Sequence, residues 1–209
     1  MRSTTCCRRM APLALAIAVA LSCSLFDPRS PQYPEEPPYQ WYDPYFPSTV
    51  LANMKSTFEA HHMAYMQCFD STFVFVADPQ DTLEYGGGLQ FGDWNYDVEY
   101  YVMDAMFGVA ASAASSYPED SLASLTLIPM PEYPDEPAPA DSTTVYREYE
   151  IVIAGSPWCG WDNPATGYAQ IYLIETSYGL WYVSRWEDFR VESSGDSLYT
   201  WGVAKANYR

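Results

Sequence analysis

The sequence predicts an α+β fold, with helices packed on one face of an antiparallel sheet. Apolar residues first recur at helical spacing, as Leu51, Met54 and Phe58 do after Ser48, a good N-cap. From residue 122 onward the chain instead shows apolar runs of strand length that are separated by turn signals. Helices followed by a meander of strands indicate this fold class.

The first helix is followed by a second helix, a strand and a third helix. The second helix is short, over residues 63–69, and follows a turn at His61 and His62. Residues 73–77 are expected to form a strand that stops at Asp78-Pro79, and the glycines at 86–88 mark a loop. The third helix is capped by Asp93 and ends near Gly108, with one apolar face formed by Trp94, Val98, Tyr101, Val102 and Ala105.

Four strands are expected in the second half, over residues 122–128, 143–154, 167–176 and 180–189. A long proline-rich loop over residues 129–141 joins the first two strands. The tail from residue 197 contains Trp201 and Tyr208, which we expect to fold back onto the domain.

Residues 1–22 have the pattern of a secretory signal peptide. Three Arg precede an uncharged apolar run over residues 13–21, which is shorter than the roughly 20 residues of a membrane-spanning helix. The string Ala20-Leu21-Ser22-Cys23 resembles a bacterial lipoprotein box, in which the Cys is acylated and becomes the new N-terminus. The alternative is ordinary cleavage nearby with a free Cys23. Because Ser24 follows Cys23, the expected location is the outer membrane or the periplasmic side of the cell envelope.

The chain therefore divides into a signal peptide (1–22), a lipidated Cys with a Pro/Tyr-rich linker (23–47) and a folded domain with its C-terminal tail (48–209). Loss of residues 1–22 removes three Arg and no acid, so the formal net charge of −17 becomes −20. Such a surface repels phosphate backbones, so nucleic acid is not an expected partner, and contact with the membrane depends on the lipid anchor. Cys68 and Cys159 form either a disulfide or two free thiols.

Several strings resemble nuclear transport factor 2-like (SnoaL-like) domains over roughly residues 48–190. They are residues 65–70, Trp94 with Glu99 and Met106-Phe107-Gly108, and the last strand from Gly179 to Asp188. The resemblance implies a curved sheet wrapped around helices, forming a cone that often holds a pocket. The family includes isomerases, cyclases, dehydratases and domains without known activity, so it does not supply a function. The candidate pocket residues are Tyr65, Trp94, Tyr101, Arg185, Trp186 and Asp188.

Asp78-Pro79 resembles the Asp-Pro of ketosteroid isomerases, in which the Asp is the general base. The first helix contains no Tyr to stabilise a developing oxyanion, so a turn Asp before Pro is the favoured interpretation. His61 and His62 are expected to be surface turn residues. The run from Asp93 begins like a calcium loop but has Val98 where Gly is required, so no metal or cofactor is expected.

Strict alternation along the last strand places Arg185 on the face of Trp181 and Val183, and Trp186 and Asp188 on the other. Arg185 with a carboxylate beside a cavity would be a polar anchor. The alternative is a structural ion pair of Arg185 with a neighbouring strand, at Glu148 or Glu150.

Trp158 and Trp161 lie at a hairpin tip, where they either stack on a sugar or a partner or cover the open end of the cone. The leading functional hypothesis is an exported, lipid-anchored, non-catalytic domain that binds a small molecule or a partner in or near the cone. The alternatives are an isomerase or cyclase that uses Asp78 or Asp188, and an aromatic-rich polysaccharide-binding module.

Overall fold

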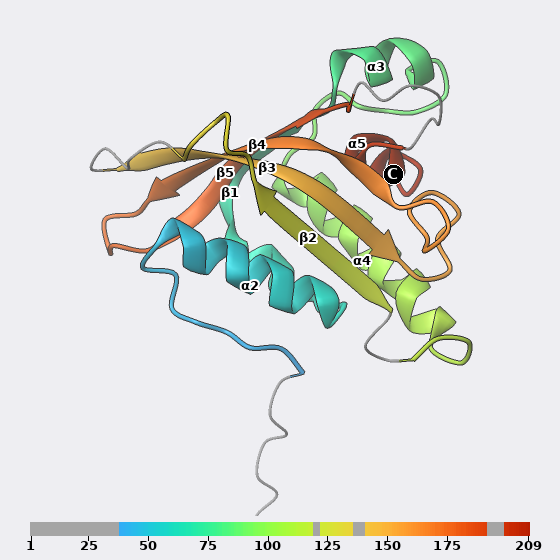
Figure 1. Cartoon of the computed structure of the whole chain (residues 1–209), viewed down its shortest axis with the longest axis horizontal. Coiled ribbons are helices and arrows are strands. Elements are labelled where there is room, and N and C mark those ends of the chain that lie inside the picture. Colours follow the sequence, from blue (N-terminus) through green and yellow to red (C-terminus); the bar gives the residue numbers. More distant parts are fainter. Residues whose placement is uncertain (1–37, 119–121, 136–140, 192–198) are drawn as a thin grey trace, which may run out of the picture. The chain divides into compact units, whose positions relative to one another are not determined.

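Within the described residues, five strands form one curved sheet in the order β1-β5-β4-β3-β2 (Figure 1). The computed structural model describes residues 38–118, 122–135, 141–191 and 199–209. β2 to β5 form the expected antiparallel meander, whereas β1 lies parallel to β5 at one edge. The α+β fold class is confirmed. The strands are β1 (Phe69–Val76), β2 (Ala123–Pro129), β3 (Ser142–Ile153), β4 (Ala165–Glu175) and β5 (Trp181–Phe189).

Two long helices, α2 (Pro47–Glu59) and α4 (Tyr96–Ala113), pack against the sheet and against each other. The rings of Phe58 in α2 and Phe107 in α4 lie edge to face, with centroids 5.5 Å apart. A 3-10 helix, η2 (Met63–Cys68), follows α2 and leads into β1. The described residues also form two short helices: α3 (Pro79–Tyr85) after β1, and α5 (Trp201–Ala206) near the C-terminal end of the given sequence.

The ends of the long helices differ from the expected ones. Helix α2 starts at Pro47 and has no side-chain cap, so Ser48 is not its N-cap. The cap of α4 is Asn95, whose side chain accepts a hydrogen bond from the Val98 N–H, and not Asp93. Helix α4 continues past Gly108 to Ala113, because its buried stripe extends through residue 110.

A β-bulge in β5 reverses the expected faces of its second half. Val183 and Arg185 oppose neighbouring residues of β4, which leaves Ser184 as an extra residue. Val183 is buried before the bulge, and Trp186 and Asp188 are buried after it. The predicted placement of Arg185 on the face of Val183 is therefore wrong, because the alternation restarts after the extra residue.

The last part of the linker packs onto the domain, as expected for its aromatic end. The side-chain amide of Asn53 pairs with the backbone of Tyr42, at 2.9 and 2.6 Å. The Pro44 carbonyl accepts a hydrogen bond from the Trp181 N–H at 2.7 Å. The predicted signal peptide, Cys23 and the first part of the linker lie outside the described residues. In the part of the chain that is described, no helix is both long and apolar enough to cross a membrane.

The short helices α3 and α5 are missing from the sequence-based prediction. Asp78 caps α3 through a hydrogen bond from the Gln80 N–H at 2.7 Å, and Pro79 occupies its first turn. The tail does fold back onto the domain, as expected, but as helix α5, which Thr200 caps. All six residues of α5 are buried, so it belongs to the core.

Candidate functional site

Asp188, near the end of β5, lies in a buried polar cluster that binds helix α5. Its Oδ1 accepts a hydrogen bond from Tyr149 Oη at 2.5 Å, and its Oδ2 accepts one from the Gly202 N–H at 2.6 Å. Tyr149 Oη accepts a further bond from the Trp201 N–H at 2.8 Å. Asp188 and Tyr149 are each only 1% exposed. The first turn of α5 is therefore attached to a carboxyl and a hydroxyl inside the cone.

Two glycines make room for this attachment. Gly167 of β4 pairs with Tyr149 of β3, and a Cβ at Gly167 would lie 2.3 Å from Tyr149 Oη. A Cβ at Gly202 would lie 3.1 Å from both Asp188 Oδ2 and Ala77 Cβ. The tyrosine and the helix approach the carboxyl this closely because neither position carries a side chain.

Burial alters the proton affinity of this cluster. It raises the pKa of the Asp188 carboxyl to about 7, against the hydrogen bonds from Tyr149 and Gly202, which lower it. Burial and the nearby Asp188 also raise the pKa of Tyr149 well above its ordinary value. A carboxyl that titrates near neutrality beside a phenol has the chemistry of a proton-transfer site. With α5 in place, however, neither group is accessible to a substrate.

A second carboxylate, Asp81 of α3, holds the start of α5. Thr200 Oγ1 donates a hydrogen bond to Asp81 Oδ2 at 2.5 Å, and Arg190 Nε donates to Oδ1. Arg190 also pairs with the exposed Glu84 at 2.7 Å. Burial raises the pKa of Asp81, and the hydrogen bonds from Thr200 and Arg190 oppose this. Helix α3, the end of β5 and helix α5 are thus joined through one buried carboxylate.

Lys205, in the last turn of α5, holds its ammonium group inside the cone. Its Nζ lies 2.8 and 3.2 Å from the two carboxylate oxygens of Glu99 in α4, and both side chains are 1% exposed. Trp94 Nε1 donates to the same carboxylate at 2.8 Å. The ammonium lies 3.4 Å from the ring centroid of Phe75, and 5.2 and 5.3 Å from those of Trp94 and Trp201. Burial lowers the pKa of Lys205, and Glu99 opposes this effect.

Four of the six predicted pocket residues are buried, but they do not line a common pocket. Tyr65 packs edge to face on Phe107, and Trp186 packs on Tyr149. Trp94 and Asp188 belong to the two buried polar groups of the cone, the first beside Lys205 and the second beside Gly202. The interior that these residues were expected to line is therefore filled by side chains of α4, β3 and α5.

The other two predicted pocket residues face solvent, which corrects the sequence-based expectation. Tyr101 is 73% exposed, because the buried stripe of α4 follows a different phase from the predicted face. Arg185 pairs with Glu187 of its own strand at 2.5 Å, and not with Glu148 or Glu150. The observed stripe consists of Glu99, Val102, Met103, Met106, Phe107 and Ala110.

Asp78, the candidate base, has a structural role. Its carboxylate accepts hydrogen bonds from the Gln80 N–H at 2.7 Å and the Arg190 N–H at 3.0 Å. It therefore caps α3, a helix that the turn interpretation did not include, and it fixes the end of β5. His61 and His62 occupy the expected turn, where His62 Nδ1 accepts a bond from the Ala64 N–H at 3.0 Å.

The hairpin tip does not present its two tryptophans as one exposed surface. Trp158 is half-buried and packs on Tyr199, with ring centroids 5.6 Å apart, whereas Trp161 is 47% exposed. Cys159, which lies between them, is a buried free thiol, and so is Cys68. Burial raises the pKa of Cys159 to about 11, so this thiol is unreactive at neutral pH.

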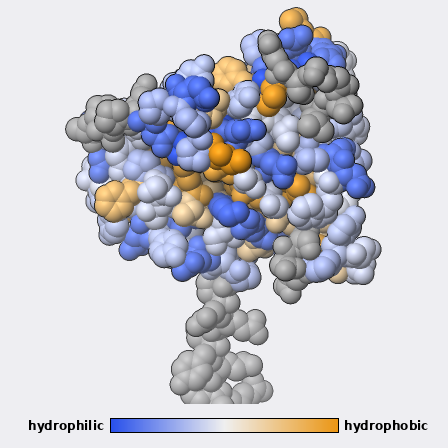
Figure 2. Space-filling view, viewed as in Figure 1, coloured by the Kyte–Doolittle hydropathy of each residue, from blue (hydrophilic) through white to orange (hydrophobic). Residues whose placement is uncertain are grey.

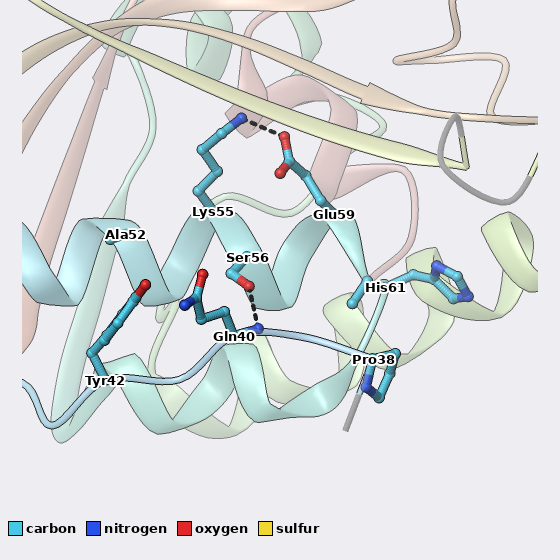
Figure 3. A pocket seen from close by; sticks show the side chains of 9 residues that line it. Pro38, Gln40, Tyr42, Ala52, Lys55, Ser56, Glu59 and His61 are labelled. Atoms are coloured by element: carbon cyan, nitrogen blue, oxygen red, sulfur yellow. Dashed lines mark hydrogen bonds and ion pairs between the residues drawn. The ribbon is translucent and has the colours of Figure 1, made fainter. Parts of the chain in front are cut away.

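An open groove of about 920 Å³ lies between α2 and the segment that precedes it (Figure 3). In Figure 3, residues 38–42 run beside α2, and the Gln40 N–H donates to Ser56 Oγ at 2.7 Å. Lys55 and Glu59 form an ion pair one helical turn apart. The groove therefore offers a cation, an anion and several polar groups that solvent can reach. Its lining residues are Pro38, Gln40, Tyr42, Ala52, Lys55, Ser56, Glu59, Ala60 and His61.

The face shown in Figure 2 is largely hydrophilic, and its apolar residues form small, separate patches. Small patches of this kind are normal on protein surfaces. Among the residues that the structure describes, no group of three or more His, Cys, Asp or Glu is placed to hold a metal ion.

The architecture matches what the resemblance implies, a nuclear transport factor 2-like cone of helices packed in a curved sheet. No family model matches the sequence, and no curated protein matches it. Similar solved structures include a protein of unknown function from Mycobacterium tuberculosis, with a TM-score of 0.45 and 12% identity over 96% of this chain and 89% of that one. An ntf2-like protein with a cystatin-like fold from Novosphingobium aromaticivorans has a TM-score of 0.42 and 8% identity over 92% of this chain and 96% of that one.

The Orange Carotenoid Protein of Anabaena (Nostoc), in a structure with canthaxanthin, has a TM-score of 0.42 and 12% identity. The match covers 80% of this chain and 43% of that one. At such identities the likeness concerns the fold alone, so the functional argument rests on the residues of this chain.

Proposed function

We propose that this chain is a lipid-anchored, non-catalytic domain of the cell envelope that binds a small molecule or a partner outside its cone. The observation that carries the proposal is the occupation of the cone by α5, all six residues of which are buried. Asp188, the best-placed acid for chemistry, is 1% exposed and bonded to the backbone of that helix. A ligand could enter the interior only by displacing part of the core.

The α2 groove is the binding surface that the proposal favours. Tyr42 supplies an exposed aromatic ring, and Lys55 supplies a cation on a chain that is otherwise strongly acidic. The segment that forms one wall of the groove is attached to α2 by two hydrogen bonds. The Tyr42 N–H donates to Asn53, and the Gln40 N–H donates to Ser56. A rigid polar groove suits a small polar ligand or an extended peptide segment.

A photo-crosslinking residue in the groove should capture the ligand or partner in intact cells. We expect benzoylphenylalanine in place of Ala52, which is exposed and lines the groove, to give a discrete adduct. The measurement is the mass of the irradiated, purified protein. The matched control places the same residue at Leu83 of α3, which is 86% exposed and lies outside the groove. Adducts at both positions, or at neither, would contradict the assignment of the groove.

Acylation of Cys23 is tested by partition into detergent. We expect the native protein to enter the detergent phase of a phase-separating detergent, and Cys23→Ala to move it to the aqueous phase, because a lipid anchor requires the thiol. Cys6→Ala, in the part that cleavage removes, is the control and should leave the partition unchanged. Native protein that is already found in the aqueous phase would remove the anchor from the proposal.

Both alternatives have less support from the geometry. An isomerase or cyclase is favoured by the pKa of Asp188 near 7 and by its bond to Tyr149, but it requires α5 to leave the interior. Asp78 is already bonded to two backbone N–H groups. A polysaccharide-binding module requires aromatic rings on one exposed surface, and the ring of Trp158 instead packs on Tyr199.

A further inference from the structure

We infer that the interior of the cone is a binding site for an alkylammonium ion, and that the chain's own Lys205 occupies it. The site has one carboxylate, Glu99, at 2.8 Å from the ammonium, and three aromatic rings around it: Phe75, Trp94 and Trp201. Aromatic rings around a cation, together with a carboxylate, are the means by which proteins recognise ammonium ligands. The carboxylate and the rings together therefore select a ligand that has a positive charge and an apolar alkyl stem.

The carboxylate is held in place independently of the lysine. Trp94 Nε1 donates to Glu99 Oε2 at 2.8 Å, which fixes the oxygen that also contacts Lys205 most closely. Glu99 is 1% exposed, so a cation is needed to balance its charge inside the domain.

Most residues of the site belong to elements other than α5, the helix that supplies Lys205. Phe75 belongs to β1, Trp94 precedes α4 and Glu99 lies in α4, whereas only Trp201 shares α5 with Lys205. Phe75 and Trp94 also line an open depression of about 570 Å³ at the edge of the sheet. Truncation of Lys205 at Cβ would therefore vacate a space with its carboxylate and rings still present, next to a depression that is open to solvent.

The test is chemical rescue of Lys205→Ala. The substitution removes three methylene groups and the ammonium, which together have the size of n-propylammonium. We expect n-propylammonium to raise the Tm of the variant by about 3–6 °C at about ten times its Kd, because it binds only the folded state. Wild type should not respond, because its own lysine fills the site. If the variant is unfolded in plain buffer, n-propylammonium should restore its near-UV circular dichroism.

Three controls separate this site from general effects of salt and of space filling. 1-Propanol has a similar size without the charge, and sodium at equal ionic strength has the charge without the stem, so neither should rescue the variant. Lys55→Ala removes a lysine that pairs with Glu59 on the surface, and it should not respond to n-propylammonium. The double variant Lys205→Ala/Glu99→Gln should lose the rescue. Equal responses to n-propylammonium and sodium, or a response that survives Glu99→Gln, would overturn the inference, as would an absence of any response.

Discussion

Lys205→Met should lower the free energy of unfolding by about 3–5 kcal/mol. The substitution leaves the Glu99 carboxylate buried without the cation that lies 2.8 Å away, and an unpaired buried charge is costly. Met has nearly the length of the lysine stem and contacts aromatic rings favourably, so the substitution leaves little empty space. The loss of stability therefore reflects mainly the missing positive charge. Equilibrium unfolding in urea at pH 7, followed by tryptophan fluorescence, measures the difference.

A second substitution distinguishes loss of charge balance from loss of packing. Lys205→Met/Glu99→Gln should recover most of the stability, because Gln can still accept the hydrogen bond from Trp94 Nε1 and carries no charge. Lys55→Met is the matched control, because its ion pair with Glu59 is on the surface, and the change there should be below about 1 kcal/mol. A double variant as unstable as Lys205→Met would show that packing of the lysine, and not its charge, matters.

The elements of the sheet were predictable because their patterns are local. The periodicity near Leu51 and the apolar runs after residue 122 predict α2 and the strands β2 to β5 to within a few residues. The order of these elements then limits the topology to helices packed on a meander. The parallel pairing of β1 with β5 joins distant segments, so no local pattern could show it.

The errors at the predicted pocket have local causes that a single sequence conceals. The face of α4 can be drawn through Tyr101 or through Met103, because apolar residues surround much of this helix. The bulge at Ser184 inserts one residue without a glycine or proline to mark it, so the alternation of β5 reads as unbroken. Asp78-Pro79 did carry a usable signal, because an N-cap followed by Pro is typical of a helix start as well as of a turn.

The burial of Lys205 inside the filled cone was the least predictable feature of the domain. Lys is almost never fully buried unless it is paired, so a lysine in a short C-terminal tail is normally assigned to the surface. Helix α5 has six residues, too few to establish a helical period in the sequence. Its position depends on contacts with Asp188 in β5 and with Glu99, which is 106 residues from Lys205 in the chain. The burial of α5 inside the cone therefore depends on tertiary contacts and not on a local sequence pattern.

The contribution of Asp188 to the stability of the domain should fall as the pH rises from about 4 to about 7. The pKa of this carboxyl is about 7 in the folded protein, against an ordinary value of 3.8. Between these values the folded state keeps a proton that the unfolded state has lost, so unfolding releases a proton and becomes easier as the pH rises. Each unit of pKa difference corresponds to about 1.4 kcal/mol, so the Asp188 contribution changes by roughly 4 kcal/mol over the whole window.

Asp188→Asn isolates this contribution. The variant cannot ionise at this position, so its unfolding free energy should lose the part of the pH dependence that arises from Asp188. The quantity to measure is the unfolding free energy of wild type minus that of the variant. It is obtained from urea unfolding at pH 4, 5, 6, 7 and 8. We expect this difference to decrease steadily up to about pH 7 and then to level off. Across this window Asp188 ionises in unfolded wild type but not in the folded protein, and the Asn variant does not ionise at this position in either state.

Asp104→Asn, at an exposed position of α4, is the control for loss of a carboxyl that is not buried. If the difference for Asp188→Asn does not change with pH, the carboxyl is ionised across the whole range, and burial does not govern its proton affinity. A decrease that is confined to Asp188→Asn would instead show that the α5 attachment holds a protonated carboxyl below neutral pH. The contribution of Asp188 to the stability of the domain should therefore be largest on the acidic side of neutrality.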